Sequence, residues 1–181
     1  MPDNTTSAPT LYTVGHSNHS EQAFLELLSL HGIEILVDVR SAPYSRYNPH
    51  FNDKNLQHTV ESAGMQYLYM GDQLGGRPEG ADFYDDEGHA LYHRMAESPE
   101  FLTGIERIEQ GIQKYRVALM CSEENPTVCH RHLLVTRVAN ARGIDVVHIR
   151  GDGRPESERV LTAGDNQGML FAEMMYDSWK S

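Results

Sequence analysis

The sequence of 181 residues contains no long apolar run, only two cysteines and comparatively few basic residues. No stretch approaches the roughly 18 consecutive apolar residues that a membrane span requires. Residues 1–10 also lack the basic and apolar regions of a secretion signal. These absences predict a cytoplasmic protein without a membrane partner, and in that compartment Cys121 and Cys129 are expected to be free thiols.

Basic residues are outnumbered, with 15 Lys and Arg against 26 Asp and Glu and a formal net charge of −11. Non-specific binding to nucleic-acid phosphates needs a broad basic surface, so this balance disfavours it. A few clustered arginines could still hold a small anion. The expected partner is therefore a small anionic or nucleotide-like ligand; nucleic acid stays possible without a broad basic surface, and the oligomeric state is left open.

What the sequence does contain is a regular alternation of apolar strands and helical segments. Ile33–Val39 is nearly continuous in aliphatic residues, which is typical of a parallel strand covered on both faces. The expected strands are Leu11–Val14, Ile33–Val39, Met65–Met70, Arg116–Met120 and Asp145–Ile149. Their alternation with helices predicts an α/β fold, a three-layer open sheet of about five mainly parallel strands with helices on both faces.

The length suits one domain with a full hydrophobic core. We expect residues 1–10 to be a disordered N-terminal lead and residues 11–150 to be a single α/β domain. Residues 151–181 break the alternation and are expected to be a C-terminal appendage packed on the domain, with a short helix over Met169–Trp179.

Polar side chains follow four of the predicted strands, at the point where each strand ends. Right-handed crossovers return the chain to the same edge of a parallel sheet, so these strand ends should share one edge, where ligands usually bind. The candidate site residues are His16, Ser17, Arg40, Tyr44, Arg46, Arg77, Cys121, Glu123, Cys129, His130 and Arg131.

The loop from Cys121 to Arg131 carries the candidate catalytic groups. Cys129 should lie near the amino end of the next helix, where the helix dipole lowers the pKa of a thiol. Cys129 is therefore a candidate nucleophile or ligand, while Cys121, at the end of a buried strand, could equally be a core residue. Glu123 and His130 could transfer protons, and His16 joins them as a third candidate.

The arginines are candidates for binding an anion. Arg131 at a helix start is repelled by the dipole unless a phosphate or a carboxylate, such as that of Asp38 or Glu123, compensates it. Arg40, Arg46 and Arg77 could clamp a phosphate or carboxylate. Nearby aromatic side chains, Tyr44, Tyr47 and Tyr69, could stack on a base or sugar or simply pack in loops. The buried Asp38 needs a partner, for which Arg40 and Arg131 are the candidates.

Two templates for cysteine chemistry can be tested directly. A cysteine phosphatase needs an arginine six positions after its nucleophile, and the sequence has Thr127 and Val135 at those positions. The spacing of Cys121 and Cys129 is wider than that of a zinc knuckle, so a structural zinc is not expected. A catalytic metal with mixed ligands from Cys121, Cys129, His130 and His16 remains an open alternative, and the sequence leaves the cofactor unknown.

Four groups of residues carry a resemblance to a known family. They are Thr13–Ser17; Asp38–Ser41 with Pro43, Ser45, Arg46 and Phe51; Leu74–Arg77; and Cys121, Glu123, Pro126 and Cys129–Arg131. In this order they resemble the family called domain of unknown function 488, across residues 11–150. The resemblance implies a compact α/β domain with these residues in its cleft, and it implies no particular substrate.

The sequence thus favours an enzyme that acts on an anionic substrate, phosphate-bearing and related to nucleotides or nucleic acids. Two alternatives stay open. One is a non-catalytic module that binds a nucleotide or a nucleic-acid end, and the other is a metal-dependent protein with Cys and His ligands.

Overall fold

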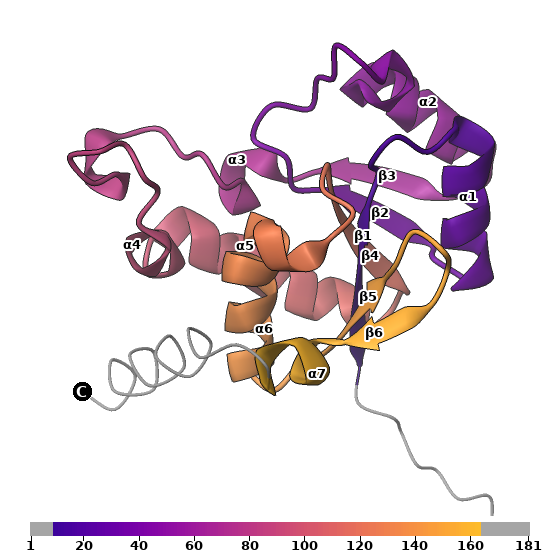
Figure 1. Ribbon diagram of the computed structural model, residues 1–181. Coiled ribbons are helices and arrows are strands. Elements are labelled where there is room, and N and C mark those ends of the chain that lie inside the picture. Colours follow the sequence, from indigo (N-terminus) through magenta and orange to yellow (C-terminus); the bar gives the residue numbers. More distant parts are fainter. Residues whose placement is uncertain (1–8, 164–181) are drawn as a thin grey trace, which may run out of the picture.

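A computed structural model describes residues 9–163, which form a six-stranded sheet between two layers of helices (Figure 1). The order of the strands across the sheet is β3-β2-β4-β1-β5-β6. The strands are β1 (Thr10–Gly15), β2 (Ile35–Asp38), β3 (Gln66–Tyr69), β4 (Val117–Cys121), β5 (Asp145–Ile149) and β6 (Pro155–Ser157). The first five are mutually parallel, which confirms the predicted α/β class.

The sixth strand lies in the segment for which the sequence predicted only an appendage. β6 runs antiparallel to β5, with Val147 opposite Ser157 and Ile149 opposite Pro155. A strand of three largely polar residues is too short to show a strand pattern in the sequence. Pro155 has no backbone N–H to donate, which is tolerated at the start of an edge strand. The predicted helix over Met169–Trp179 and most of the predicted N-terminal lead lie outside the described residues.

Helices cover both faces of the sheet. The α-helices are α1 (Glu21–Leu30), α2 (Asp53–Ser62), α3 (Gly71–Leu74), α4 (Tyr92–Ala96), α5 (Pro99–Ile112), α6 (Arg137–Ala141) and α7 (Glu158–Ala163). Short helical turns of other types are η1 (Pro49–Phe51), η2 (Ala81–Phe83), η3 (Pro126–Val128) and the π-helix η4 (Arg131–Thr136). Among the described residues, no helix combines the length and the apolar character that crossing a bilayer needs.

The two longest capped helices start as their sequences predict. The Ser20 hydroxyl accepts from the backbone N–H of Ala23 at 3.2 Å and caps α1. The Ser98 hydroxyl accepts from the N–H of Phe101 at 3.3 Å and caps α5, in which Pro99 occupies the first turn. Each side chain satisfies one of the backbone donors that a helix start leaves unpaired.

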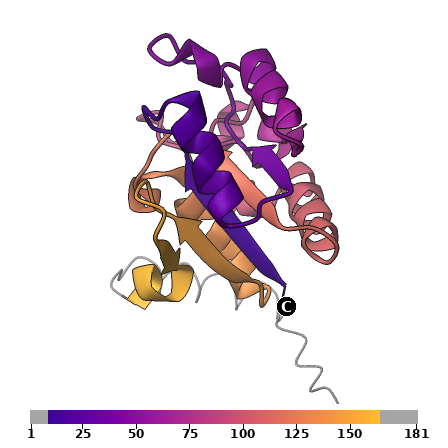
Figure 2. The ribbon, with the colours of Figure 1, turned by 90° about the vertical axis from the view of Figure 1, so that its right-hand side faces the viewer.

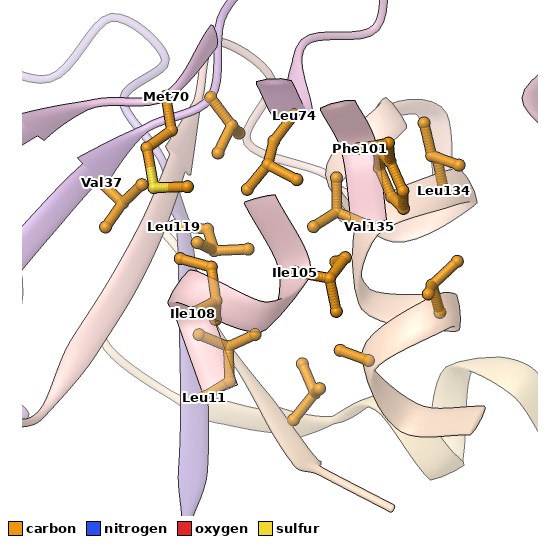
Figure 3. Close-up of a cluster of buried hydrophobic side chains, with 14 of the residues drawn as sticks. Leu11, Val37, Met70, Leu74, Phe101, Ile105, Ile108, Leu119, Leu134 and Val135 are labelled. Carbon is orange, nitrogen blue, oxygen red and sulfur yellow. The ribbon is translucent and has the colours of Figure 1, made fainter. Parts of the chain in front are cut away.

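Alternate residues of the central strands feed two separate hydrophobic clusters. On one face, Val37 and Leu119 pack with Phe101 and Ile105 of α5, in a cluster that also takes in Leu134 (Figure 3). The second cluster lies on the opposite face and includes Leu36 and Met120 of the sheet with Phe24, Leu28, Leu56 and Val60 of α1 and α2. Figure 2 shows α1 lying in front of the sheet. The middle strands are therefore buried on both sides, as their aliphatic sequences require.

The chain leaves the neighbouring strands β1 and β4 toward opposite faces. After β1 it enters α1, whose apolar residues belong to one cluster, and after β4 it enters η4 and α6, whose apolar residues belong to the other. In open α/β sheets, ligands bind in the crevice where adjacent strands diverge in this way. The carboxyl ends of β1 and β4 are thus the expected place for a site.

Candidate functional site

The segments that follow β1, β2 and β4 meet at this edge. The backbone N–H of His16 donates to the carbonyl of Cys121 at 2.9 Å, and that of Ser17 donates to the carbonyl of Ser122 at 2.9 Å. The ladder between β1 and β4 therefore continues beyond the strands and brings His16 beside the start of the cysteine loop, by which we mean residues 121–129. Arg40, from the end of β2, lies 3.2 Å from His16 through its Nη1 atom.

Cys121, the first residue of this loop, lies beside His130, the residue that follows the loop. The Nδ1 atom of His130 lies 3.6 Å from the Sγ of Cys121 and 3.9 Å from the Sγ of Cys129. The Nε2 atom lies 3.0 Å from the backbone carbonyl of Val39. Because a carbonyl only accepts, Nε2 carries a proton, and in the neutral ring Nδ1 presents its lone pair to the two sulfurs. His130 can therefore take a proton from a thiol or bind a metal at this atom.

The two buried thiols have opposite electrostatic environments. A hydrogen bond from Cys129 lowers the pKa of Cys121, against the opposing effect of burial, and the nearby His130 and Arg131 lower it further. The same contact and burial raise the pKa of Cys129. The sequence had predicted the lowered pKa for Cys129 from its place before a helix. In the structure the environment lowers the pKa of Cys121 instead, because the contact with Cys129 and the nearby His130 and Arg131 favour the charged form of Cys121.

The two sulfurs and His130 line a pocket of about 270 Å³. Its lining residues are Arg40, Ser41, Ala42, Gly76, Arg77, Tyr92, Cys121, Ser122, Glu123, Val128, Cys129 and His130. Six of these were not among the candidate site residues from sequence: Ser41, Ala42, Gly76, Tyr92, Ser122 and Val128. Tyr92 follows a polar stretch with no strand end beside it, so nothing in the sequence pointed it toward the site.

Two motif glycines are explained by close approach of neighbouring atoms. A Cβ atom on Gly76 would lie 2.7 Å from the Cγ of His130, so the backbone at this position packs flat against the imidazole ring. A Cβ on Gly15 would lie 1.8 Å from the carbonyl oxygen of Glu123. Only glycine fits at these two positions without displacing His130 or the cysteine loop.

Arg40 is held in a rigid buried group at the edge of the pocket. Its guanidinium donates to Asp38 at 2.7 and 2.9 Å and to the carbonyl of Phe51 at 2.8 Å. Of the two partners predicted for Asp38, the structure therefore shows Arg40. His16 donates from Nδ1 to the carbonyl of Ser17 at 2.8 Å, and burial, with Arg40 also contributing, lowers its pKa to about 4. Neutral His16 accepts from Arg40 and does not line the pocket.

The family model described as Domain of unknown function DUF488 matches residues 20–138. The chain belongs to the DUF488 family. The matched range contains the cysteine loop, the glycine motif at 74–77 and the end of β2, which together build the pocket. A search of curated proteins and a search of solved structures returned no match to the chain.

Arg131 of this DUF488 chain is a bracing residue and not part of the pocket surface. It is fully buried and donates to the backbone carbonyls of Glu123 and Glu124, the latter at 2.7 Å. Its Nε donates to the hydroxyl of Thr13 at 3.3 Å. The sequence predicted that the Arg131 guanidinium binds an anion or the side chain of Asp38 or Glu123. In the structure it donates to these backbone carbonyls and to the Thr13 hydroxyl instead. The buried Arg131 guanidinium thus holds the cysteine loop through its backbone carbonyls.

The remaining candidates from sequence fall into two groups. Arg77 is exposed at the rim, where it borders both the cysteine pocket and a neighbouring pocket of about 660 Å³. Ser17, Tyr44 and Arg46 line neither of these two pockets. Tyr44 is 72% exposed, and the Ser17 hydroxyl turns toward Asn18, at a backbone φ of 47°. Arg77 is therefore the predicted anion-binding arginine that the fold best presents to a ligand.

The DUF488 site also offers a set of metal ligands. The side chains of Cys121, Cys129 and His130 place three ligating atoms within 4.8 Å of one another. A sulfur and a nitrogen bound to one tetrahedral zinc are about 3.6 Å apart, close to the distances from His130 to the two sulfurs. The carbonyl of Val39 on the other ring nitrogen is the kind of contact that orients a metal-binding histidine. His16, proposed from sequence as a further ligand, uses both ring nitrogens in other contacts.

Proposed function

We propose that this protein is an enzyme that uses the thiolate of Cys121 as a nucleophile toward an anionic substrate. The observation that carries the proposal is the contact of Cys121 with His130, whose other ring nitrogen is fixed by the Val39 carbonyl, at the floor of a pocket. A cysteine nucleophile needs an adjacent base in this arrangement and a third group that orients the base. The hydrogen bond from Cys129 adds a donor that stabilises the thiolate.

The chemical step is a displacement at an electrophilic centre such as a carbonyl or a phosphoryl group. The Cys121 sulfur forms the new bond with its own electron pair, and the leaving group departs with the pair of the broken bond. His130, which holds the thiol proton on Nδ1, gives that proton to the leaving group. Water then attacks the cysteinyl intermediate and loses a proton to His130, and Cys121 leaves as the thiolate.

The anionic character of the substrate follows from the rim of the pocket. Arg77 is exposed there with no acidic partner in an ion pair among the described residues, whereas the charge of Arg40 at the pocket edge is paired with Asp38. Glu123 also lines the pocket and can exchange protons with a substrate group. The adjoining pocket is lined by Tyr69 and Phe83, whose rings suit a nucleobase. A phosphate-bearing, nucleotide-related substrate fits both pockets.

The experiment is a screen of nucleotides and other small phosphate compounds by thermal shift, followed by mass spectrometry of the products. We expect a ligand that stabilises the wild type and is converted by it. The Cys121→Ser variant should bind this ligand and convert none of it, and Arg77→Ala should bind it at least about tenfold more weakly, as loss of one charged hydrogen bond implies.

Arg46→Ala is the matched control, because Arg46 is also exposed but lines neither pocket. Conversion by Cys121→Ser would refute the proposal, and binding without any conversion would make the protein a binding module.

A second candidate function is favoured by the ligand geometry of the same residues. Cys121, Cys129 and His130 fit three positions of a tetrahedral zinc and leave the fourth open, as in catalytic sites. A bound zinc would supply a Lewis acid or an activated water. Elemental analysis of the purified protein, before and after chelation, separates the two candidates. One metal per chain that is lost in Cys129→Ser would support this second function and exclude a free Cys121 thiolate.

A further inference from the structure

The C-terminal part of the described chain reaches the cysteine loop through a buried network. Glu158, the first residue of α7, is fully buried, and its carboxylate accepts from His148 Nε2 at 2.5 Å and from the Thr136 hydroxyl at 3.0 Å. The Nδ1 atom of His132 lies 3.0 Å from the same carboxylate. Burial opposes the charged form, but the two histidine contacts outweigh it and hold the pKa of Glu158 at about 2. The centre of the network is thus a buried carboxylate ion.

The hydrogen bonds from this carboxylate lead in one direction to Arg131. Thr13 Oγ1 lies 2.6 Å from His148 Nδ1 and accepts from the Nε of Arg131 at 3.3 Å. Because Arg131 only donates, the Thr13 hydroxyl is free to give its own proton to His148 Nδ1. That leaves the proton of His148 on Nε2, where Glu158 accepts it. A buried cation and a buried anion therefore stand at the two ends of one consistently oriented chain.

The cationic end of this chain holds the cysteine loop. Arg131 donates to the backbone carbonyls of Glu123 and Glu124. The positive charge of Arg131 also helps to lower the pKa of Cys121. A displacement of Arg131 would therefore change both the path of the loop and the stability of the thiolate.

A second network of hydrogen bonds holds the same loop through the side chain of Glu124. Arg150, in the turn after β5, donates to both carboxylate oxygens of Glu124 at 3.0 Å, and the N–H of Gly151 donates to one of them at 2.9 Å. Arg150 also donates to Glu156 of β6 at 2.5 Å. A bidentate arginine–carboxylate pair fixes orientation as well as distance. Both networks thus start in the segment 150–158, which follows the part of the chain that the DUF488 family model matches.

We infer that the segment 150–158 is a functional part of the site, in which Glu158 is a positioning residue that acts through His148, Thr13 and Arg131 to hold the cysteine loop in its reactive geometry. The inference rests on the proposed function, because it assumes that Cys121 is the reacting group. His132, His148 and Glu158 could also be ligands of a metal, since their ligating atoms lie within 4.8 Å of one another. The 2.5 Å contact favours the hydrogen-bonded network, because ligand atoms around one zinc are about 3 Å apart or more.

The test measures the reactivity of Cys121 without any substrate. Each variant is alkylated with iodoacetamide across a pH series, and mass spectrometry of the peptides separates Cys121 from Cys129. The midpoint of the rate profile reports the pKa of Cys121. Glu158→Gln keeps the size and an accepting oxygen but removes the charge, and we expect it to raise this midpoint by about one pH unit or more, a tenfold change in thiolate population below the midpoint.

Matched variants isolate the network from general loss of stability. Thr13→Val removes the hydroxyl and should raise the midpoint, whereas Thr13→Ser keeps the hydroxyl and should restore the wild-type profile. Arg150→Gln removes the bidentate pair with Glu124 and should also raise the midpoint. Arg159→Gln is the control on α7, because Arg159 is exposed and pairs with Asp145 outside both networks. If Glu158→Gln fails to fold, the Thr13 pair and Arg150→Gln decide the outcome.

An unchanged or lowered midpoint in the folded variants would overturn the inference, since a direct charge effect of Glu158 alone would lower it. One metal per chain that disappears with Glu158→Gln, while Cys121→Ser retains it, would also overturn it in favour of a metal site. These failures are distinct from failure of the proposed function. An ordinary midpoint for Cys121 in the wild type would contradict the nucleophile itself, whereas a low wild-type midpoint that no variant moves contradicts only the role of segment 150–158.

Discussion

Replacement of Gly76 by alanine tests whether the position of His130 governs the site. The added Cβ would lie 2.7 Å from Cγ, 2.8 Å from Cβ and 3.1 Å from Nδ1 of His130, and real Cβ atoms essentially never approach closer than 3.0 Å. The ring must therefore move by roughly half an ångström or more to reach ordinary contact. On its other sides it meets Cys121 at 3.6 Å and the Val39 carbonyl at 3.0 Å, so a shift must disturb one of these contacts.

The expected cost is that of overpacking a close contact, about 1–3 kcal/mol in the free energy of unfolding. We also expect the pKa of Cys121 to rise toward that of an ordinary thiol as His130 moves away from the sulfur. Urea denaturation measures the first effect and the pH profile of alkylation measures the second. An ordinary thiol gains about tenfold in rate with each pH unit below its pKa, whereas a thiol with a low pKa reacts at a nearly constant rate across that range.

Gly111→Ala provides the control for this substitution. Gly111 lies inside α5, and a Cβ there would meet only Val117, at the ordinary contact distance of 3.7 Å. Alanine should therefore stabilise the helix by about 0.5–1 kcal/mol and leave the thiol profile unchanged. The reasoning is refuted if Gly76→Ala is as stable as the wild type and its Cys121 titrates as before.

Three further results are expected. Arg131→Met should destabilise the fold by about 3–5 kcal/mol in denaturation experiments, because it removes a buried cation and leaves two loop carbonyls unpaired; a loss below about 1 kcal/mol would contradict the bracing role. Folding should lose stability as the pH falls from 6.5 toward 4, because the pKa of His16 is lower in the folded chain than in the unfolded one, and a His16→Asn variant should lose part of this slope. Peroxide should oxidise Cys121 to a sulfenic acid, which the Cys129 thiol then converts to a disulfide with release of water, so a thiol count should fall by two in the wild type and a sulfenic-acid probe should label only Cys129→Ser.

The layers of the fold were predictable because two of the central strands, β2 and β4, read as nearly continuous apolar runs. Ile35–Asp38 and Val117–Cys121 carry their own signal of burial on both faces, and Ser20 and Ser98 mark helix starts through local hydrogen bonds. β6 gave no such signal, since its place at the sheet edge is set by the turn at 150–154 and by pairing with β5. A strand of three polar residues is specified by tertiary contacts that no local pattern contains.

The convergence of the candidate residues on one edge of the sheet was predictable, but their individual contacts were not. Strand connectivity brings His16, Arg40 and Cys121 to one edge, and connectivity can be followed from sequence. Which thiol is ionised depends on which sulfur accepts from the other, and that depends on how the cysteine loop folds back toward β4. The helix-dipole argument for Cys129 considered one element alone and missed this contact.

The arginines show the same limit and lead to a sharper picture of the ligand. A buried guanidinium forms its hydrogen bonds with acceptors of the protein itself. Arg131 donates to backbone carbonyls, and Arg40 donates to the Asp38 carboxylate and the Phe51 carbonyl. The charge of Arg131 still acts at a distance and lowers the pKa of Cys121, whereas the charge of Arg40 is paired with Asp38. Under the proposed function, direct recognition of the anion would fall to the exposed Arg77, which borders both pockets. A substrate held in this way would carry its anionic group at the boundary between the pockets, with its reacting centre at Cys121 and its larger part beside Tyr69 and Phe83.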